Sequence, residues 1–190
     1  MFDLKKQAER FKDHVAKFVD YGNIKILDFG KPGDSSYRIR FLFEEDYCRL
    51  HISGDLGELI ACNYENMRYE KFFDSFVHNV GYFESKIKTC SRPIYCFDYD
   101  QAVKDLEEFL GKYELVEEDE IQEKVEEILQ DFDDDTGIGS KGCDVLSEID
   151  SDWWEYAGSG VPIGKVKTGI LDLYMLAYEL AWNQLKKEEQ

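Results

Sequence analysis

The sequence predicts an α+β protein in which helices cover one face of an antiparallel sheet. Three observations lead to this expectation. An amphipathic helical period occupies residues 3–20, four short alternating segments separated by turns occupy residues 23–64, and acidic helical periods dominate beyond residue 98. With 43% hydrophobic and 15% aromatic residues among 190, the chain can fill a core despite its charge.

The first element expected is a helix over residues 3–20, where apolar side chains recur at spacings of three and four. Four strands follow, joined by the turn sequences KPGDSS, EED and GDLG. In the second strand, apolar residues alternate with Arg38 and Arg40, the period of a strand with one buried face. We therefore expect a four-stranded antiparallel meander, with strands at 23–30, 37–43, 47–53 and 58–64.

An aromatic helix over residues 67–87 is expected to cover this meander. Its apolar stripe is broad enough to face a core and is interrupted at Gly81. The stripe comprises Tyr69, Phe72, Phe73, Phe76, Val77, Val80, Phe83 and Ile87. Cys90-Ser91-Arg92-Pro93 ends the helix, and IYCF then forms a short strand or a buried linker.

The rest of the chain reads as helical. Helices are expected over residues 100–112 and 117–132, followed by the loop DDDTGIGSKG, a short helix through Val145–Ile149 and a final helix from Lys165. The predicted division is an α+β core over 1–97 and an acidic helical region over 98–190 that packs on it. A single domain remains the alternative.

The charge is confined to one part of the chain. The sequence has 41 acidic and 23 basic residues, a net charge of −18. Residues 1–97 and 156–190 are each balanced, whereas residues 98–155 carry 22 acids and four lysines. Charge confined to one segment creates a directional field that attracts cationic partners and repels anionic ones.

This segment predicts binding to a basic protein through nucleic-acid mimicry. Helices of 13 and 16 residues would be about 20 and 24 Å long, and aligned they would approach the charge density of duplex DNA. Direct binding of nucleic acid is not expected, because the protein as a whole would repel phosphates. The plain alternative is an acidic surface that serves solubility alone. The predicted partner-binding carboxylates are Glu117, Glu118, Asp119, Glu120, Glu123, Glu126, Glu127, Asp131, Asp133, Asp134 and Asp135.

Two adjacent tryptophans complete the predicted partner-binding set. Trp153 and Trp154 cannot both face one core from a regular helix, because neighbouring side chains diverge by about 100°. We expect one of them to be exposed, as an anchor for an arginine-rich surface. The alternative is that both are partly buried beneath the last helix.

A metal site is the second hypothesis. Asp131, Asp133 and Asp135 match positions 1, 3 and 5 of an EF-hand loop, but Thr136 and Gly142 depart from the glycine and glutamate expected at positions 6 and 12. The alternative is a loop that caps a helix. A carboxylate-metal enzyme or calcium-responsive module using this loop, with Asp98 and Asp100, therefore stays the second functional class.

No enzymatic motif accompanies the cysteines and histidines, and neither a catalytic residue nor a cofactor is expected. The five cysteines are odd in number and lie in apolar contexts, which favours reduced thiols and a cytoplasmic location. No apolar stretch approaches the length of a membrane helix, and the N-terminal segment carries acids, unlike a signal peptide.

The run RLHISGDLGELIACNYENMRYEKFFDSFVHNVGYFESKI, residues 49–87, resembles a segment of small acidic proteins from phages and mobile elements of Firmicutes. That group includes anti-CRISPR proteins. The resemblance implies a protein that acts in the cytoplasm of a bacterial host, binds a CRISPR effector nuclease such as Cas9 and blocks DNA binding or cleavage. It carries over no functional residue, and the oligomeric state stays open.

Overall fold

The computed structural model describes residues 3–153 and 163–188. It divides the chain into two compact units, which we call the sheet unit (residues 1–94 and 169–190) and the acidic unit (residues 95–168). Helices and antiparallel strands coexist, so the predicted α+β class is confirmed. The main sheet has six strands rather than the four predicted.

The six strands form a meander in which each strand pairs only with its neighbours in sequence. All five pairings are antiparallel. One face of the meander supplies fully buried side chains, among them Leu27, Ile39 and Phe41. The strands are β1 (Val15–Asp20), β2 (Ile24–Gly30), β3 (Ile39–Glu44), β4 (Arg49–Gly54), β5 (Leu59–Cys62) and β6 (Ile87–Cys90).

The helix predicted over residues 3–20 is wrong beyond residue 11. The chain forms helix α1 (Leu4–Ala8) and a 3₁₀ turn, η1 (Glu9–Phe11), and then enters β1. Alternation within β1 buries Ala16 and leaves Lys17 exposed. The valines of β1 favour a strand, and pairing with β2 along its whole length overrides the local helical spacing.

The single aromatic helix predicted over 67–87 is also wrong in form, although its core residues are buried. Phe72, Phe76 and Phe83 are fully buried, as the stripe predicts. Asn79 interrupts the segment by accepting a hydrogen bond from the backbone amide of Tyr82. The segment comprises η2 (Glu65–Met67), α2 (Tyr69–Phe72), the π-helical turn η3 (Phe73–Val77) and α3 (Val80–Glu84), before the chain returns to the sheet as β6.

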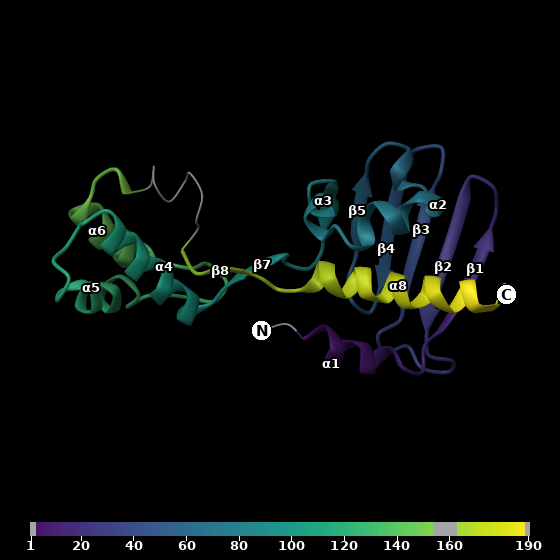
Figure 1. Ribbon diagram of the computed structural model, residues 1–190, viewed down its shortest axis with the longest axis horizontal. Coiled ribbons are helices and arrows are strands. Elements are labelled where there is room, and N and C mark those ends of the chain that lie inside the picture. The colour runs from purple at the N-terminus through teal and green to yellow at the C-terminus, as the bar shows by residue number, and fades with distance from the viewer. Residues whose placement is uncertain (1–2, 154–162, 189–190) are drawn as a thin grey trace. The chain divides into compact units, whose positions relative to one another are not determined.

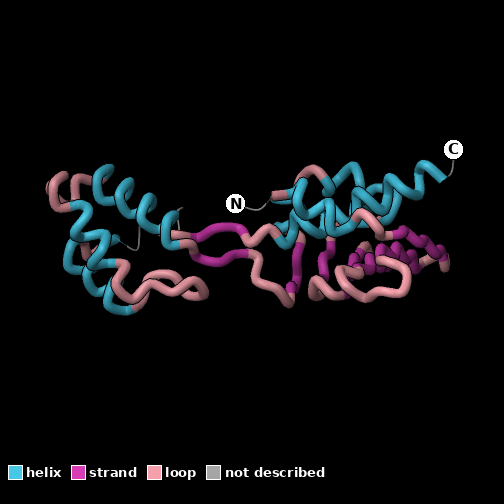
Figure 2. The backbone as a smooth tube through the Cα atoms, turned by 90° about the horizontal axis from the view of Figure 1, so that it is seen from below, coloured by secondary structure: helices cyan, strands magenta, loops and turns pink. Residues whose placement is uncertain are grey.

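The last helix, α8 (Ile170–Glu188), belongs to the sheet unit. It crosses the same face of the sheet as α2 and α3 (Figure 1), and Figure 2 shows the helices of the sheet unit on one side of its strands. Tyr178 of α8 is fully buried, and its ring packs edge-on against Phe41 and Phe72. Its hydroxyl donates to the carbonyl oxygen of Tyr69, and burial raises the pKa of this phenol.

The acidic unit has a core of its own. Leu106, Leu110, Val125, Ile128 and Leu146 pack together in it. The helix predicted over 117–132 is shorter, because residues 117–120 form a turn and the helix ends at Ile128. The elements of this unit are β7 (Tyr95–Phe97), α4 (Tyr99–Lys112), α5 (Ile121–Ile128), α6 (Ser140–Ile149) and β8 (Lys165–Lys167).

The predicted division lies between residues 97 and 98, and the acidic unit begins at residue 95. The main difference is that the last helix was predicted in the acidic region and belongs to the sheet unit. The chain enters the acidic unit through β7 and leaves it through β8, and these two strands pair antiparallel. An insertion whose ends meet leaves its host continuous. The acidic unit is therefore inserted between β6 and α8, and the host fold closes only when α8 returns to the sheet.

All five cysteines are free and half-buried. None of the described helices combines the length and the apolar run that crossing a bilayer requires.

Gln184 of α8 closes the edge of the sheet at β1. Its side-chain oxygen accepts from the amide of Ala16 at 2.9 Å, and its side-chain nitrogen donates to the carbonyl of His14 at 2.9 Å. The side-chain amide of Gln184 thus offers β1 one acceptor and one donor, as the backbone of a neighbouring strand would. It therefore satisfies backbone groups that would otherwise be open to edge-to-edge pairing.

We expect Gln184→Ala to lower the free energy of unfolding of the sheet unit by about 1–3 kcal/mol, because two backbone groups lose their partner. Denaturant titration measures this loss. Gln184→Glu is the matched control, since it keeps an acceptor for Ala16 but has no donor for His14. Its free energy of unfolding should lie between those of the wild type and Gln184→Ala. Equal stability of all three proteins would contradict this role.

His14 is the one buried polar residue in the described core, with 4% of its surface exposed. Nε2 lies 3.3 Å from the carbonyl oxygen of Tyr37, which assigns the proton to Nε2, and Nδ1 has no partner. The ring contacts Phe11 and Phe29. Burial lowers the pKa of His14, and the nearby carboxylates of Asp13 and Asp34 offset part of this effect.

The sheet unit should lose stability as the pH falls below the ordinary histidine pKa of about 6.5, because the unfolded state then binds a proton that buried His14 does not. The slope from this group is at most about 1.4 kcal/mol per pH unit. Chemical denaturation between pH 5 and 7, compared with His14→Gln, measures it. Identical slopes for the two proteins would show that His14 does not contribute.

Candidate functional site: the acidic unit

The negative charge of the chain lies almost entirely in the acidic unit. Residues 95–168 contain 22 acidic and six basic residues, a net charge of −16. The sheet unit contains 19 acidic and 17 basic residues, a net charge of −2. The charge segregation seen along the sequence is therefore also a segregation between two folded bodies.

Ion pairing differs between the two units. Cations of the sheet unit pair with its own carboxylates, as in Arg40 with Asp28 at 2.7 Å and Lys71 with Glu65 at 2.8 Å. Between described side chains of the acidic unit, one ion pair is present, Lys124–Glu127 at 2.7 Å. The carboxylates of the acidic unit are thus largely uncompensated within the described part of the chain.

We define the acidic flank as residues 114–135, which contain twelve acidic residues and one lysine. All the predicted partner-binding carboxylates belong to this stretch of the sequence. Lys124 pairs with Glu127, and Asp131 alone among the twelve acids is half-buried. The other eleven acids are exposed: Glu114, Glu117, Glu118, Asp119, Glu120, Glu123, Glu126, Glu127, Asp133, Asp134 and Asp135.

Asp131 has a structural role at the edge of the flank. Its carboxylate accepts hydrogen bonds from the backbone amides of Lys141 at 2.9 Å and Gly142 at 3.2 Å, at the start of α6. These donors lower its pKa. Gly139, the N-cap residue, has no side chain to do this, and a Cβ there would lie 2.3 Å from the Asp131 carboxyl.

The EF-hand hypothesis has no geometric support. Asp133 accepts from the backbone amides of Asp135 and Thr136, which lowers its pKa, so this carboxylate serves its own turn. Gly142, which departs from the EF-hand glutamate, must be glycine because a Cβ would lie 2.0 Å from the carbonyl oxygen of Ile128. Within residues 3–153 and 163–188, no three His, Cys, Asp or Glu side chains gather as a metal site.

Sequence reasoning missed Glu114 and an open hollow beside it. Residue 114 follows the end of α4 with a φ of 53°, a left-handed conformation usually taken by glycine. This turn places acids and aliphatic side chains around one depression, which suits the stem and head of a lysine or arginine. The hollow is lined by Gly111, Glu114, Val116, Glu117, Glu118 and Ile121.

The predicted tryptophan anchor is placed only in part. Trp153 is half-buried against the core of the acidic unit, and its indole nitrogen donates to the Ser147 hydroxyl at 3.1 Å. Trp153 is thus partly buried, and the expectation that one of the two tryptophans is exposed stays a prediction. Trp154 lies outside the described residues.

Comparisons with protein-family models, with curated proteins and with solved structures found no match to this chain.

We expect Asp131→Ala to lower the melting temperature of the acidic unit by about 5 °C, because α6 loses its cap. The wild-type advantage should shrink on acidification, since a carboxylate with a lowered pKa loses its contribution as pH falls through that pKa. Thermal unfolding followed by circular dichroism measures both. Asp134→Ala is the matched control, because Asp134 is exposed. Equal melting temperatures for the two variants would contradict the capping role.

Proposed function

We propose that this protein is a phage-type inhibitor that binds a basic, nucleic-acid-binding effector through the acidic flank. The effector class that fits best is a CRISPR nuclease such as Cas9, in the cytoplasm of a bacterial host. The flank would occupy part of the channel that receives DNA or guide RNA and so block DNA binding or cleavage. This action is stoichiometric binding and needs no turnover.

The observation that carries the proposal is the uncompensated charge of the acidic unit. A net −16 on a body of 74 residues creates a strong field, and the sheet unit at −2 contributes little to it. If solubility were its only role, nothing would require the carboxylates to lie in one unit. Concentration of negative charge in one unit is what a cationic groove would recognise.

Duplex-like spacing along two aligned helices supports the proposal less than the sequence suggested. Helix α5 has eight residues and is about 12 Å long, half the length expected. The support comes instead from the number of exposed carboxylates in a short stretch of the chain. Turn, helix and loop together present eleven exposed carboxylates between residues 114 and 135. The hollow beside Glu114 adds a place where one cationic side chain of the partner would insert.

The test is inhibition of DNA cleavage by a guide-loaded Cas9-type nuclease. Reversal of Glu117, Glu118, Glu120, Glu123, Glu126 and Glu127 to Lys should abolish inhibition, because the flank becomes cationic. The milder variant E118Q/E123Q/E126Q should weaken inhibition at least tenfold, since three charges that attract the groove are lost.

The matched control E9Q/E58Q/D74N removes the same charge from exposed positions of the sheet unit. It should leave inhibition within about twofold of wild type. Circular dichroism verifies that each variant folds. Undiminished inhibition by the folded six-lysine variant, or equal losses in the two triple variants, would exclude the flank as the binding surface.

A further inference from the structure

A second surface, on the sheet unit, is marked by three tyrosines. Tyr21, Tyr47 and Tyr64 are 69%, 69% and 84% exposed, whereas Val15, the next most exposed large hydrophobic residue among those the structure describes, is 49% exposed. Tyrosine is enriched at protein interfaces and among the residues that contribute most to binding.

The meander brings these tyrosines to one end of the sheet. Tyr21 lies in the β1–β2 turn, Tyr47 in the β3–β4 turn and Tyr64 in the segment after β5. Because alternate connections of an antiparallel meander fall at the same end, all three belong to the end at the top of Figure 1. Strands lie about 4.8 Å apart, so neighbouring loops are about 7–10 Å from one another. We call this surface the tyrosine end.

Backbone hydrogen bonds join the three loops. The amide of Glu45 donates to the carbonyl of Asn23 at 2.8 Å, which links the first two turns. The amide of Asn63 donates to the carbonyl of Cys48 at 3.1 Å, which links the second turn to the third loop. A surface braced in this way loses little conformational entropy when a partner binds.

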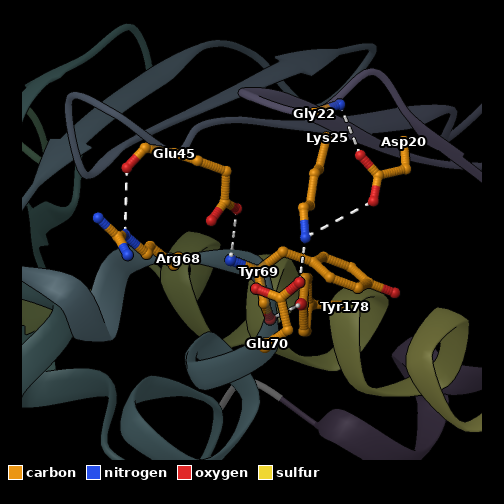
Figure 3. Close-up of polar contacts among 8 residues, drawn as sticks. All are labelled: Asp20, Gly22, Lys25, Glu45, Arg68, Tyr69, Glu70 and Tyr178. Carbon is orange, nitrogen blue, oxygen red and sulfur yellow. Dashed lines mark hydrogen bonds and ion pairs between the residues drawn. The ribbon is translucent and has the colours of Figure 1, made fainter.

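Glu45 and Arg68 strengthen the same connection. Arg68 donates to the carbonyl oxygen of Glu45 at 3.2 Å, and the Glu45 carboxylate accepts from the backbone amide of Tyr69 at 3.0 Å (Figure 3). On the first turn, the Asp20 carboxylate accepts from the amide of Gly22 and pairs with Lys25. These contacts hold the bases of two turns in place.

The loop that carries Tyr64 is fixed by a separate network. The side-chain amide of Asn63 donates to Asn66 at 2.8 Å and to the Tyr82 hydroxyl at 3.1 Å. Donation to this oxygen lowers the pKa of Tyr82. Tyr64 therefore projects from a loop whose other side chains bond to one another, which orders the loop before any partner arrives.

The charges around the tyrosines indicate the chemistry of the partner. Residues 20–25, 44–49 and 63–71 contain six acids and four basic residues, and Glu65 among these acids pairs with Lys71. Asp46 and Glu65 are exposed beside Tyr47 and Tyr64. Arg49 lies 5.6 Å from the centre of the Tyr47 ring, which shows that this ring can stack with a guanidinium; a partner's arginine would use the rest of the exposed ring or replace Arg49.

We propose that the tyrosine end binds a protein surface that presents arginine side chains, which would stack on the exposed rings and pair with Asp46. Tyrosine is suited to this because it offers a rigid ring and a polar tip. The inference does not depend on the acidic flank, since every residue that carries it belongs to the sheet unit.

The test uses the full chain labelled with fluorotyrosine, in the E118Q/E123Q/E126Q background to weaken binding at the flank. The probe is the peptide Gly-Arg-Gly-Arg-Gly, with the citrulline peptide of the same length as its neutral match. Fluorine resonances of Tyr21, Tyr47 and Tyr64, assigned by single Tyr→Phe variants, should shift saturably with the arginine peptide. The citrulline peptide should shift them at least fivefold less.

The variant Y21A/Y47A/Y64A should weaken arginine-peptide binding at the sheet unit at least tenfold. The matched control Val15→Ala, in which the next most exposed large apolar residue is truncated, should leave it within twofold. Single Tyr→Phe variants keep the ring and should bind like the parent. Shifts confined to the acidic unit, or equal shifts with citrulline, would overturn the proposal. So would self-association that sedimentation detects and the triple variant abolishes, because the occupant would then be a second copy.

Discussion

Mutual repulsion among the carboxylates of the acidic unit is the constraint on which the rest of the structure depends. Repulsion destabilises a compact state unless cations, solvent or a partner offset it. Within the described residues, cations offset it at Lys124–Glu127 and backbone amides offset it at Asp131 and Asp133. Amide groups also donate to Asp98, Asp105, Glu107 and Asp150. Solvent screens the exposed carboxylates, and a cationic partner would do so more strongly. The free energy lost to repulsion in the free protein is thus available to favour binding.

The fold confines most of this repulsion to a unit separate from the larger core of the sheet unit. Pairing of β7 with β8 brings the two ends of the acidic unit together, so its insertion leaves the six-stranded sheet intact. Helix α8 then supplies Tyr178 to the aromatic core and Gln184 to the open edge of β1. The sheet unit is nearly charge-balanced, whereas the acidic unit carries nearly all the excess charge. Two candidate binding surfaces consequently lie on separate bodies of one chain.

Alternation and turn residues were sufficient to predict four of the six strands, and the charge sums were sufficient to locate the candidate site. They failed at β1, where Val15–Asp20 fits both a helical and a strand period and only pairing with β2 decides. They failed at β6 and at the break near Asn79, which follow from tertiary packing of the aromatic segment.

Parts of the candidate site in the acidic unit could not be predicted from the sequence either. Sequence spacing could not reveal that Asp131 caps α6 from ten residues away, although Gly139 and Gly142 were signals of close backbone approach. Nor could it reveal the hollow beside Glu114, because a left-handed glutamate has no pattern in sequence. The tyrosine end was hidden for another reason. Tyr21, Tyr47 and Tyr64 lie far apart in sequence, and only the direction of each strand brings them together.

The most direct test of the central claim is the salt dependence of inhibition by the wild-type protein. A guide-loaded Cas9-type nuclease is titrated with this protein at several salt concentrations between about 50 and 200 mM, and the inhibition constant is corrected for the effect of salt on DNA binding. If uncompensated carboxylates enter a cationic groove, affinity should fall steeply and linearly on a double-logarithmic plot. Affinity that stays constant across this range would contradict the account.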